Sequence, residues 1–329
     1  MHNEEFLHLL KSRVHSLLPS ISRRFGMFPG GQPVSFVSSH LRSLTAKDFL
    51  VCEKSDGTRY LMLFADTGTE EAPEPVVFLI DRNWRVWGFE GMRCPGDAGP
   101  DTLIDGELIK SRNGDYKFLI FDLLLYSGKD VTQEPLDRRL GCIEKHVVAK
   151  TQQPHMPFPI GLKRFYKPYG IQELLERIIP GQEHGNDGLI FTPLKEPYQS
   201  GTWQNLLKWK PAELNSVDFK LAPDGLTLLV SCGTADERGN RPHEAFARLD
   251  TPHPELVGQI LECTLLNEQD NMWSFQRVRH DKTMANDVQV TKNILASIRD
   301  RVDKDELIKI LPEIRRIYKE REAAGLVPK

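Results

Sequence analysis

Short apolar runs broken by turn residues fill positions 49–125, and this pattern restricts that part of the chain to β structure. Two pairs of runs predict β-hairpins. One pair covers residues 75–89 and turns at Arg82-Asn83, and the other covers residues 103–125 and turns at Asn113-Gly114-Asp115. Because a short turn joins strands that run in opposite directions, we expect antiparallel sheets.

Helical patterns follow these strands. Apolar residues recur at helical spacing between Leu136 and Val147, and a second helix from Ile171 ends at Pro180-Gly181. After Pro211, short strands alternate with turn clusters, which predicts a small β-barrel over residues 214–285. The expected fold class is therefore α+β, with a first domain over residues 1–213 and the barrel as the second.

The tail is also helical in pattern. Val290, Ile294 and Ile298 share one helical face, and Pro312 either interrupts the last stretch or opens a new helix. The pattern does not distinguish helices over residues 286–329 that join the first domain from helices that form a dimer contact.

Composition limits the classes of function. The 329 residues carry a formal net charge of -3, so any contact with nucleic acid must come from a local basic surface. The five cysteines are scattered without a Cys-x-x-Cys pair, which is typical of reduced core thiols and not of a zinc site. No apolar run approaches 18 residues and no secretory leader is recognisable, so neither a membrane span nor secretion is expected.

A compact charged run lies between two of the apolar runs. It reads Glu53-Lys54-Ser55-Asp56-Gly57-Thr58-Arg59, and Asp-Gly in such a place is an ordinary hairpin signal. The run therefore permits two interpretations, a solvated hairpin turn or a loop that aims the Lys54 amine at a phosphorus atom.

Five further segments pair charged residues with predicted strand ends. Singly, each has a plain structural interpretation, such as an exposed bend, a paired buried acid or an edge strand guarded by lysines. In chain order they are Asp105-Gly106-Glu107, Phe121-Asp122, Asp187-Gly188, Lys208-Trp209-Lys210-Pro211 and residues 273–282, which include Arg279, Asp281 and Lys282. Together with the Lys54 run they favour a single site.

Covalent nucleotidyl transfer would use all of these groups. A lysine ammonium ion is not nucleophilic, and cations such as Arg59, Lys208 and Lys210 would favour the neutral amine and offset charge on an α-phosphate. Carboxylates at Glu107 and Asp187 could hold a divalent metal or accept hydrogen bonds from ribose hydroxyls.

The order of these segments resembles that of the covalent nucleotidyltransferases, the superfamily of RNA capping guanylyltransferases and polynucleotide ligases. Lys-x-Asp-Gly-x-Arg at 54–59 is similar to the superfamily's nucleophile motif. Three segments resemble the capping branch, namely residues 28–36, residues 206–219 and the block from Trp273 to Lys282. The resemblance covers the chain from about residue 25 to about residue 285.

The resemblance implies a nucleotidyltransferase domain, of the type found in DNA ligases, followed by an OB-fold barrel. It implies that Lys54 attacks the α-phosphorus of GTP with Mg²⁺ or Mn²⁺, and that the resulting lysyl-GMP passes GMP to a 5′-diphosphate RNA. Arg59 and Glu107 would hold the ribose, Phe121 would stack on guanine, and Lys208 and Lys210 would contact the α-phosphate. The remaining implied site residues are Asp187 for the metal, Glu107 as a second metal ligand, Glu53, Asp56 and Gly57 around the nucleotide, and Arg279, Asp281 and Lys282 at the β- and γ-phosphates.

The family also implies partners and a place in the cell. An RNA 5′-triphosphatase must supply the diphosphate end, and no Cys-x₅-Arg phosphatase motif precedes the resemblance in this sequence. The phosphorylated C-terminal domain of RNA polymerase II and a nuclear location are further expectations. Two alternatives stay open at this point, an ATP-dependent polynucleotide ligase and a catalytically inactive RNA-binding scaffold.

Overall fold

The computed structural model describes residues 4–21, 25–69, 71–94, 96–148, 157–211, 214–236, 241–300 and 302–327. Contacts between Cα atoms divide the chain into two compact units. The larger unit contains residues 1–34, 41–209 and 308–329, and the smaller unit contains residues 35–40 and 210–307. The predicted α+β fold class, with antiparallel sheets and a C-terminal β domain, is confirmed.

A seven-stranded sheet forms the centre of the larger unit. Its strand order is β5-β4-β3-β6-β7-β8, and β9 pairs in parallel with β7. The strands are β3 (Thr58–Asp66), β4 (Pro75–Ile80), β5 (Val86–Glu90), β6 (Thr102–Lys110), β7 (Tyr116–Tyr126), β8 (Lys129–Asp130) and β9 (Ile160–Leu162). The pairs β4–β5 and β6–β7 are antiparallel, which confirms both predicted hairpins.

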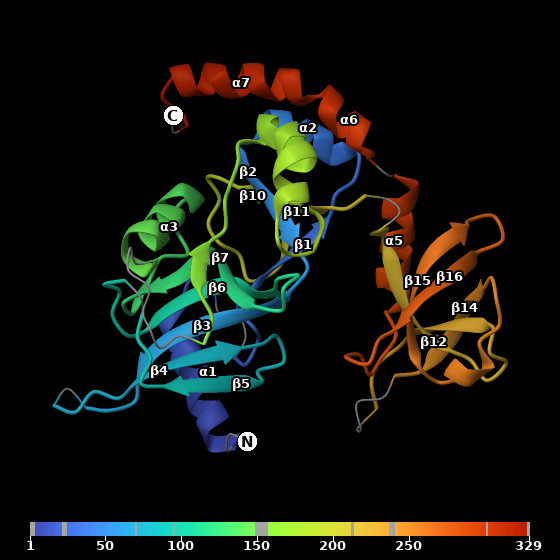
Figure 1. Cartoon of the computed structure of the whole chain (residues 1–329), viewed down its shortest axis with the longest axis horizontal. Helices are drawn as coiled ribbons and strands as arrows, with labels where there is room; N and C mark the ends of the chain where they lie inside the picture. The colour runs from blue at the N-terminus through green and yellow to red at the C-terminus, as the bar shows by residue number, and fades with distance from the viewer. Residues whose placement is uncertain are drawn as a thin grey trace. The chain divides into compact units, whose positions relative to one another are not determined.

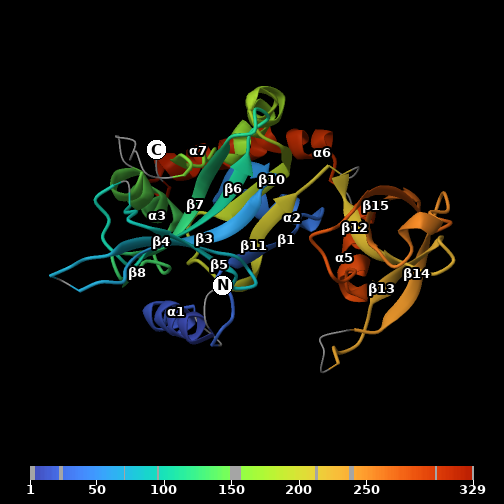
Figure 2. The same ribbon diagram turned by 60° about the horizontal axis from the view of Figure 1, so that its bottom comes forward.

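Both faces of this sheet are buried because its strands are apolar at successive positions. Leu61 and Leu63 of β3 lie in a core with Leu10 and Val14 of α1 (Glu4–Leu17), which covers one face (Figure 2). Met62 lies in a second core on the opposite face, as strand alternation requires. That second core includes residues of α3 (Leu136–Cys142) and of the π-helical turn Ile143–Val147 that continues it, as the apolar spacing predicted.

A four-stranded sheet completes the larger unit, with the order β1-β11-β10-β2 (Figure 1). Its strands are β1 (Gly31–Ser35), β2 (Phe49–Ser55), β10 (Asn186–Pro193) and β11 (Gly201–Trp209). The hairpin interpretation of the Lys54 run is wrong, because β2 pairs with β10 whereas β3 pairs with β4 and β6. The run therefore passes from one sheet to the other.

Short helices complete this unit. α2 (Ser39–Ala46) precedes β2, and the helix expected from Ile171 is a series of single turns that ends at Pro180-Gly181. Its parts are a 3₁₀ turn over Pro168–Gly170, α4 (Ile171–Glu173), a π-helical turn over Leu174–Ile178 and a 3₁₀ turn over Ile179–Gly181. α6 (Lys304–Lys309), which begins in the smaller unit, leads to α7 (Leu311–Ala323), which Pro312 opens. Tyr318 of α7 packs with Leu136 and Leu194 of the larger unit.

The smaller unit is a closed barrel with the order β12-β13-β14-β16-β15. Its strands are β12 (Ser216–Leu221), β13 (Thr227–Ser231), β14 (His243–Leu249), β15 (Ile260–Asn267) and β16 (Met272–Val278). A 3₁₀ turn over Pro254–Leu256 precedes β15. Leu295 of α5 (Val288–Arg299) packs into the barrel core with Phe219 and Trp273. The contact division groups α5 with the barrel and α7 with the larger unit. Among the described residues, no helix is both long enough and apolar enough to cross a bilayer.

Candidate active site

Lys54 lies at the end of β2, where a bulge in the neighbouring strand brings an acid to it. The register between β10 and β2 shifts between Asn186 and Leu189, and bulges of this kind redirect side chains. Lys54 Nζ donates a hydrogen bond to Asp187 Oδ1 over 2.7 Å, and both side chains are 25% exposed. The amine and the carboxylate are therefore in contact and open to solvent.

A buried lysine that the motifs did not identify lies beside Lys54. Lys163 Nζ lies 3.6 Å from Glu53 Oε1 and 3.6 Å from Glu107 Oε2, and it donates to the Glu53 carbonyl over 3.1 Å. Burial alone would lower the pKa of Lys163, but Cys52, Glu53 and Glu107 outweigh it and raise that pKa. The cation therefore stays charged between the two acids.

The two acids respond differently to this shared cation. Burial raises the pKa of Glu107, and the positive charges of Lys163 and Lys54 offset only part of the effect. Burial also acts on Glu53, but the nearby His184 ring, whose Nε2 lies 3.8 Å from Glu53 Oε1, and the Lys163 charge together hold the pKa of Glu53 below its ordinary value. Glu53 is thus a fixed anion, whereas Glu107 is the more easily protonated of the two.

The loop between the two sheets is fixed by Gly57. Its backbone N–H donates to Glu107 Oε1 over 3.2 Å. A Cβ atom on Gly57 would lie 2.6 Å from the Leu108 carbonyl oxygen, so only glycine permits this approach. Asp56, which precedes it, is exposed, and its N–H donates to the Gly185 carbonyl over 3.0 Å.

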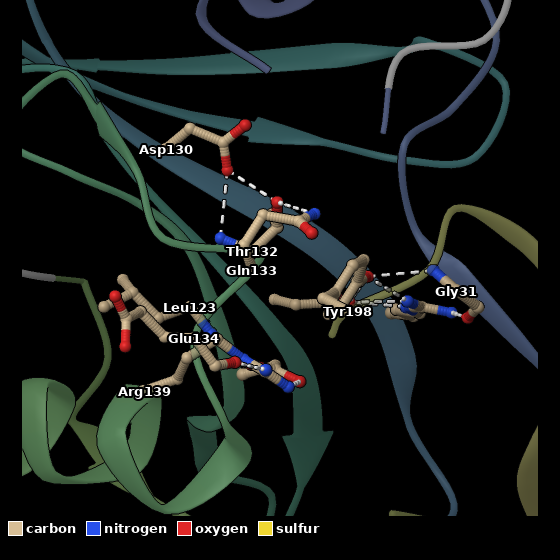
Figure 3. A network of polar contacts seen from close by, with 11 residues as sticks. Gly31, Leu123, Asp130, Thr132, Gln133, Glu134, Arg139 and Tyr198 are labelled. Carbon is tan, nitrogen blue, oxygen red and sulfur yellow. Dashed lines mark hydrogen bonds and ion pairs between the residues drawn. The ribbon is translucent and has the colours of Figure 1, made fainter. Parts of the chain in front are cut away.

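Arg59 is held rigidly by a buried network. Its guanidinium donates to both carboxylate oxygens of Asp105, over 2.9 and 2.5 Å, and to the Gly31 carbonyl over 2.5 Å. Tyr198 Oη donates to Asp105 Oδ2 over 2.6 Å and accepts the Gly31 N–H over 2.8 Å. Figure 3 shows Tyr198 directed at Gly31. Asp105 offsets the charge of Arg59, so the effect of Arg59 on the Lys54 amine stays a prediction.

Phe121 lies between two of these cations. The Arg59 guanidinium carbon is 5.4 Å from the centre of its ring, and Lys163 Nζ is 5.9 Å from it. The ring is half-buried rather than a core residue. The adjacent Asp122 is buried and paired with Arg139 over 2.6 and 2.9 Å, so it is a structural acid.

Lys208 belongs to the same sheet as Lys54. It is opposite Ile190 of β10, which in turn is opposite Cys52 of β2. Residues in one such row share a face, and Lys54 is two positions beyond Cys52, so Lys208 and Lys54 share a face of the four-stranded sheet. Lys210 follows the end of β11 and belongs by its contacts to the smaller unit.

The residues of the last motif form a separate cluster in the smaller unit. Arg279 donates to Asp218 over 2.9 and 3.2 Å and to both oxygens of Asp281 over 2.9 Å each. Lys282 Nζ lies 3.8 Å from Asp218 Oδ2. The hydrogen bonds from Arg279 lower the pKa of Asp281 to about 2. Burial raises the pKa of Asp218 despite the two cations.

Motif reasoning missed four residues of these clusters: Asp105 as the partner of Arg59, Lys163, Tyr198 and Asp218. Asp105 and Asp218 lie inside motifs that the sequence did identify, so their charge was a usable signal. Lys163 and Tyr198 are single residues in unremarkable sequence, and only the fold brings them to the site.

The acids of this site suit a divalent metal that takes most of its ligands from a bound phosphate compound and from water. No three His, Cys, Asp or Glu side chains in the described part of the chain gather as a metal cage. Mg²⁺ commonly takes one or two carboxylates and fills its other positions with phosphate oxygens and water. The carboxylates of Asp187 and Glu107 supply a donor set of that kind.

Comparison with known families agrees with this arrangement. A model of the mRNA capping enzyme catalytic domain matches residues 2–212, and a model of the mRNA capping enzyme C-terminal domain matches residues 214–308. The chain belongs to the mRNA capping enzyme family. This membership identifies an mRNA guanylyltransferase with GTP and RNA as substrates.

Relatives that match most of this chain carry the same family name. The mRNA-capping enzyme subunit alpha of Schizosaccharomyces pombe is 35% identical over 353 residues, which are 95% of this chain and 86% of that protein. That of Neurospora crassa is 32% identical, covering 92% and 90%. The Danio rerio mRNA-capping enzyme is 32% identical over 90% of this chain and 52% of its own length. Among solved structures, a mycobacterial DNA ligase D complexed with ATP and MES has 15% identity and a TM-score of 0.41, covering 77% of this chain and 95% of its own.

Proposed function

We propose that Lys54 is the nucleophile of this capping enzyme and that it forms a covalent lysyl-GMP. The observation that carries the proposal is the contact of the Lys54 amine with Asp187 at the junction of two sheets. Glu107 is close enough for the Lys54 charge to act on its pKa, and Arg59 lies against Phe121 in the adjoining sheet. A half-buried aromatic ring, a fixed arginine and an acid near a lysine amine are suited to bind a nucleotide.

The first step forms a phosphoramide bond. The neutral Lys54 amine attacks the α-phosphorus of GTP, the bond to the β-phosphate oxygen breaks, and pyrophosphate leaves. The amine loses a proton, and Asp187 Oδ1, at 2.7 Å, is placed to orient or accept it. Lys208, on the same sheet face, supplies positive charge for the α-phosphate.

The second step releases the enzyme. A terminal oxygen of the RNA 5′-diphosphate attacks the same phosphorus, the phosphorus–nitrogen bond breaks, and Lys54 leaves with a proton. The product carries a GpppN end. Arg59, fixed by Asp105, and Glu107 would hold the ribose through both steps, while Phe121 would stack on the guanine.

Asp187 and Glu107 would hold Mg²⁺ or Mn²⁺ during the reaction. A divalent cation held there would offset phosphate charge, and Asp187 would then be less available to stabilise the Lys54 ammonium. Arg279, Asp281 and Lys282 of the smaller unit would act on the β- and γ-phosphates. Glu53, Asp56, Gly57 and Lys210 complete the proposed nucleotide site.

The proposed setting follows from the family. An RNA 5′-triphosphatase would supply the diphosphate end, the phosphorylated C-terminal domain of RNA polymerase II would recruit the enzyme, and the nucleus would be its location. Family membership supports these proposals, and binding and localisation measurements would test each.

Labelling with α-³²P-GTP and Mg²⁺, followed by denaturing electrophoresis, tests the nucleophile. We expect an adduct with the native protein that pyrophosphate reverses, none with Lys54→Ala or Lys54→Met, and a normal one with Lys47→Ala. Lys47 is the matched control because it also pairs with an acid, Glu196, over 3.0 Å. A folded Lys54 variant that still becomes labelled would refute the assignment, and labelling by ATP alone would place the chain with the ligases.

A further inference from the structure

One end of the seven-stranded sheet carries exposed aromatic rings among cations. The turns 81–85 and 111–115 both lie at the end where β3 begins, since Leu61 is opposite Ile80 and Thr58 is opposite Leu108. We name this the turn-end surface. Its residues are Tyr60, Arg82, Arg85, Trp87, Lys110, Arg112 and Tyr116, of which all except Tyr60 are exposed.

Its aromatic rings occupy a single face. Trp87 is opposite Leu79, which in turn is opposite Met62. Tyr116 is opposite Lys110, and this pair lies two residues beyond the Leu108–Phe118 pair on the same two strands. Tyr60, Met62, Leu108 and Phe118 share the face away from Arg59, because successive strand residues alternate. Trp87 and Tyr116 therefore project from the same face, separated by four strand spacings (about 19 Å) across the sheet and by six residues (about 20 Å) along it, since the row of Trp87 crosses β6 at Ile104 and that of Tyr116 crosses it at Lys110.

Each exposed ring has a cation beside it. Trp87 is 41% exposed and Tyr116 is 50% exposed. Arg85 lies 5.9 Å from the centre of Trp87, and Lys110 lies 5.7 Å from that of Tyr116. Tyr60 meets Trp87 edge to face, with ring centres 5.4 Å apart. Large exposed rings that lie beside cations are suited to stack with bases near phosphates.

The surface is positive although the whole chain is not. Residues 81–87 and 110–116 contain Arg82, Arg85, Lys110 and Arg112 against Asp81 and Asp115, a local balance of +2. Asp81 is buried and bound to Arg85, and the exposed Asp115 is bound to Asn113. A chain with a net charge of -3 thus presents a basic surface beside the loop that holds Lys54.

We propose that the turn-end surface binds single-stranded RNA of the acceptor, a few nucleotides from its 5′ end. The inference rests on the proposed function. Two residues separate the end of β2 from the start of β3, so an RNA whose 5′ end lies at Lys54 would pass round the start of β3, from the face of Arg59 and Glu107 to the face of the rings. Stacking and phosphate contacts are tolerant of sequence, as an enzyme acting on different transcripts requires. The two rings are far enough apart to engage separate nucleotides.

RNA binding without GTP tests the proposal. We would measure anisotropy of 3′-fluorescein RNAs with 5′-diphosphate ends, of about 4 and about 20 nucleotides, across a salt series. For the longer RNA, we expect Trp87→Ala to raise Kd roughly tenfold and Trp87→Phe to raise it much less. The double variant Arg82→Ala, Arg112→Ala should lower the slope of log Kd against log salt by about 1.4.

The control is Arg177→Ala with Arg316→Ala. These arginines are 79% and 62% exposed and each pairs with an acid one helical turn away, so we expect native Kd and native salt slope. Native binding of the long RNA by both the Trp87→Ala and the Arg82/Arg112 variants would overturn the proposal. Displacement of the RNA by a phosphoserine peptide whose own binding needs Trp87 would assign the surface to a peptide and would also overturn it.

The proposal and the proposed function can fail separately. A protein that binds RNA through Trp87 yet forms no GMP adduct would retain the RNA surface and lose Lys54 as nucleophile. If the protein forms the adduct and its RNA affinity does not depend on Trp87, the proposed RNA surface is refuted and Lys54 remains the proposed nucleophile.

Discussion

The Tyr198 hydroxyl fixes the position of Arg59 through a buried hydrogen-bond network. It donates to Asp105 Oδ2 over 2.6 Å, accepts the Gly31 N–H over 2.8 Å, and lies 3.3 Å from the Arg59 guanidinium. Burial raises the pKa of Tyr198 well above its ordinary value, so the hydroxyl stays protonated and continues to donate. Tyr198 is therefore a positioning residue.

Replacing Tyr198 by phenylalanine should loosen Arg59. We expect a loss of about 1–3 kcal/mol in the free energy of unfolding, because Asp105 and the Gly31 N–H lose a buried partner. If Arg59 holds the ribose, KM for GTP in adduct formation should rise more than kcat falls. Urea unfolding and labelling kinetics measure both. Tyr169→Phe is the control, since that ring packs on Tyr318, and an unchanged KM in Tyr198→Phe would contradict the positioning role.

Replacing Lys163 by methionine should make the free energy of unfolding depend on pH between 5 and 7.5. The native cation has a raised pKa, so its contribution is present below the unfolded value of about 10.4 and is lost only as pH rises through the folded one. Without it, burial would raise the pKa values of Glu53 and Glu107 above their unfolded values, and the folded state would bind more protons. Stability of the variant should then fall as pH rises from 5 to 7.5.

The expected deficit of Lys163→Met is about 3–5 kcal/mol at pH 7.5, the usual cost of leaving a buried charge unpaired, and less at pH 5. Urea unfolding at the two pH values measures it. Lys47→Met removes a half-exposed pair with Glu196 and should cost less than about 1 kcal/mol at either pH. A deficit in Lys163→Met that is the same at both pH values would contradict the pairing.

At the residue scale, motif spacing could predict Lys54, Arg59, Glu107 and Phe121, which the structure brings to one region. It could not predict Lys163 or Tyr198, because a single buried lysine or tyrosine has no local pattern. Their role arises from ladders and loops between residues far apart in sequence, such as the 110 positions that separate Lys163 from Glu53.

At the scale of elements, local signals predicted strands better than their partners. The hairpins at 75–89 and 103–125 formed because a short turn leaves neighbouring strands only one antiparallel partner nearby. The Asp56-Gly57 turn looked the same, yet β2 pairs with β10, more than 130 positions away. Ladder choice there depends on burial against the second sheet, which no local window contains.

Arg321 of α7 fixes the end of α2, and its removal should destabilise the larger unit. Its guanidinium donates to the carbonyls of Thr45 and Ala46, over 3.0 Å each, and to Asp48 over 2.8 Å. Cations are stabilising at helix C-termini, where carbonyl groups lack partners. We expect Arg321→Ala to cost about 1–2 kcal/mol in urea unfolding.

The matched control for Arg321 lies on the same helix. Arg316 is exposed and pairs only with Glu320 one turn away, so Arg316→Ala should change stability by less than about 0.5 kcal/mol. Equal effects of the two substitutions would show that Arg321 contributes no more than a surface pair.

At the scale of the whole molecule, the sequence could predict both family domains because each has its own strand pattern and motif set. The grouping of the tail was less accessible. Val290, Ile294 and Ile298 predict an amphipathic helix, but an apolar face alone does not indicate which core the helix packs against. Contacts of Leu295 with the barrel core, and of Tyr318 with Leu136, divide the tail between the two units.

The Arg279 and Lys282 cluster of the smaller unit should matter mainly for one half of the reaction. In the described residues, Arg279 and Lys282 are held by acids, chiefly Asp218, which phosphate oxygens would have to replace. Their proposed partners, the β- and γ-phosphates, depart as pyrophosphate after the first step. We therefore expect Arg279→Ala and Lys282→Ala to slow formation of the GMP adduct by about 100-fold or more, and transfer from a preformed adduct to RNA much less.

Single-turnover labelling with GTP, and chase of isolated adduct with 5′-diphosphate RNA, separate the two steps. Arg277→Ala is the matched control, because Arg277 lies two residues away, is 65% exposed and pairs with Glu262 over 2.6 Å. It should leave both rates near native. Equal losses in the two steps for Arg279→Ala would mean that this arginine acts on groups present throughout, such as the α-phosphate, or supports the barrel. Unfolding measurements distinguish the two explanations. If Arg279 supports the barrel, Arg279→Ala should destabilise the protein more than Arg277→Ala does, and if it acts on the α-phosphate the two variants should be equally stable.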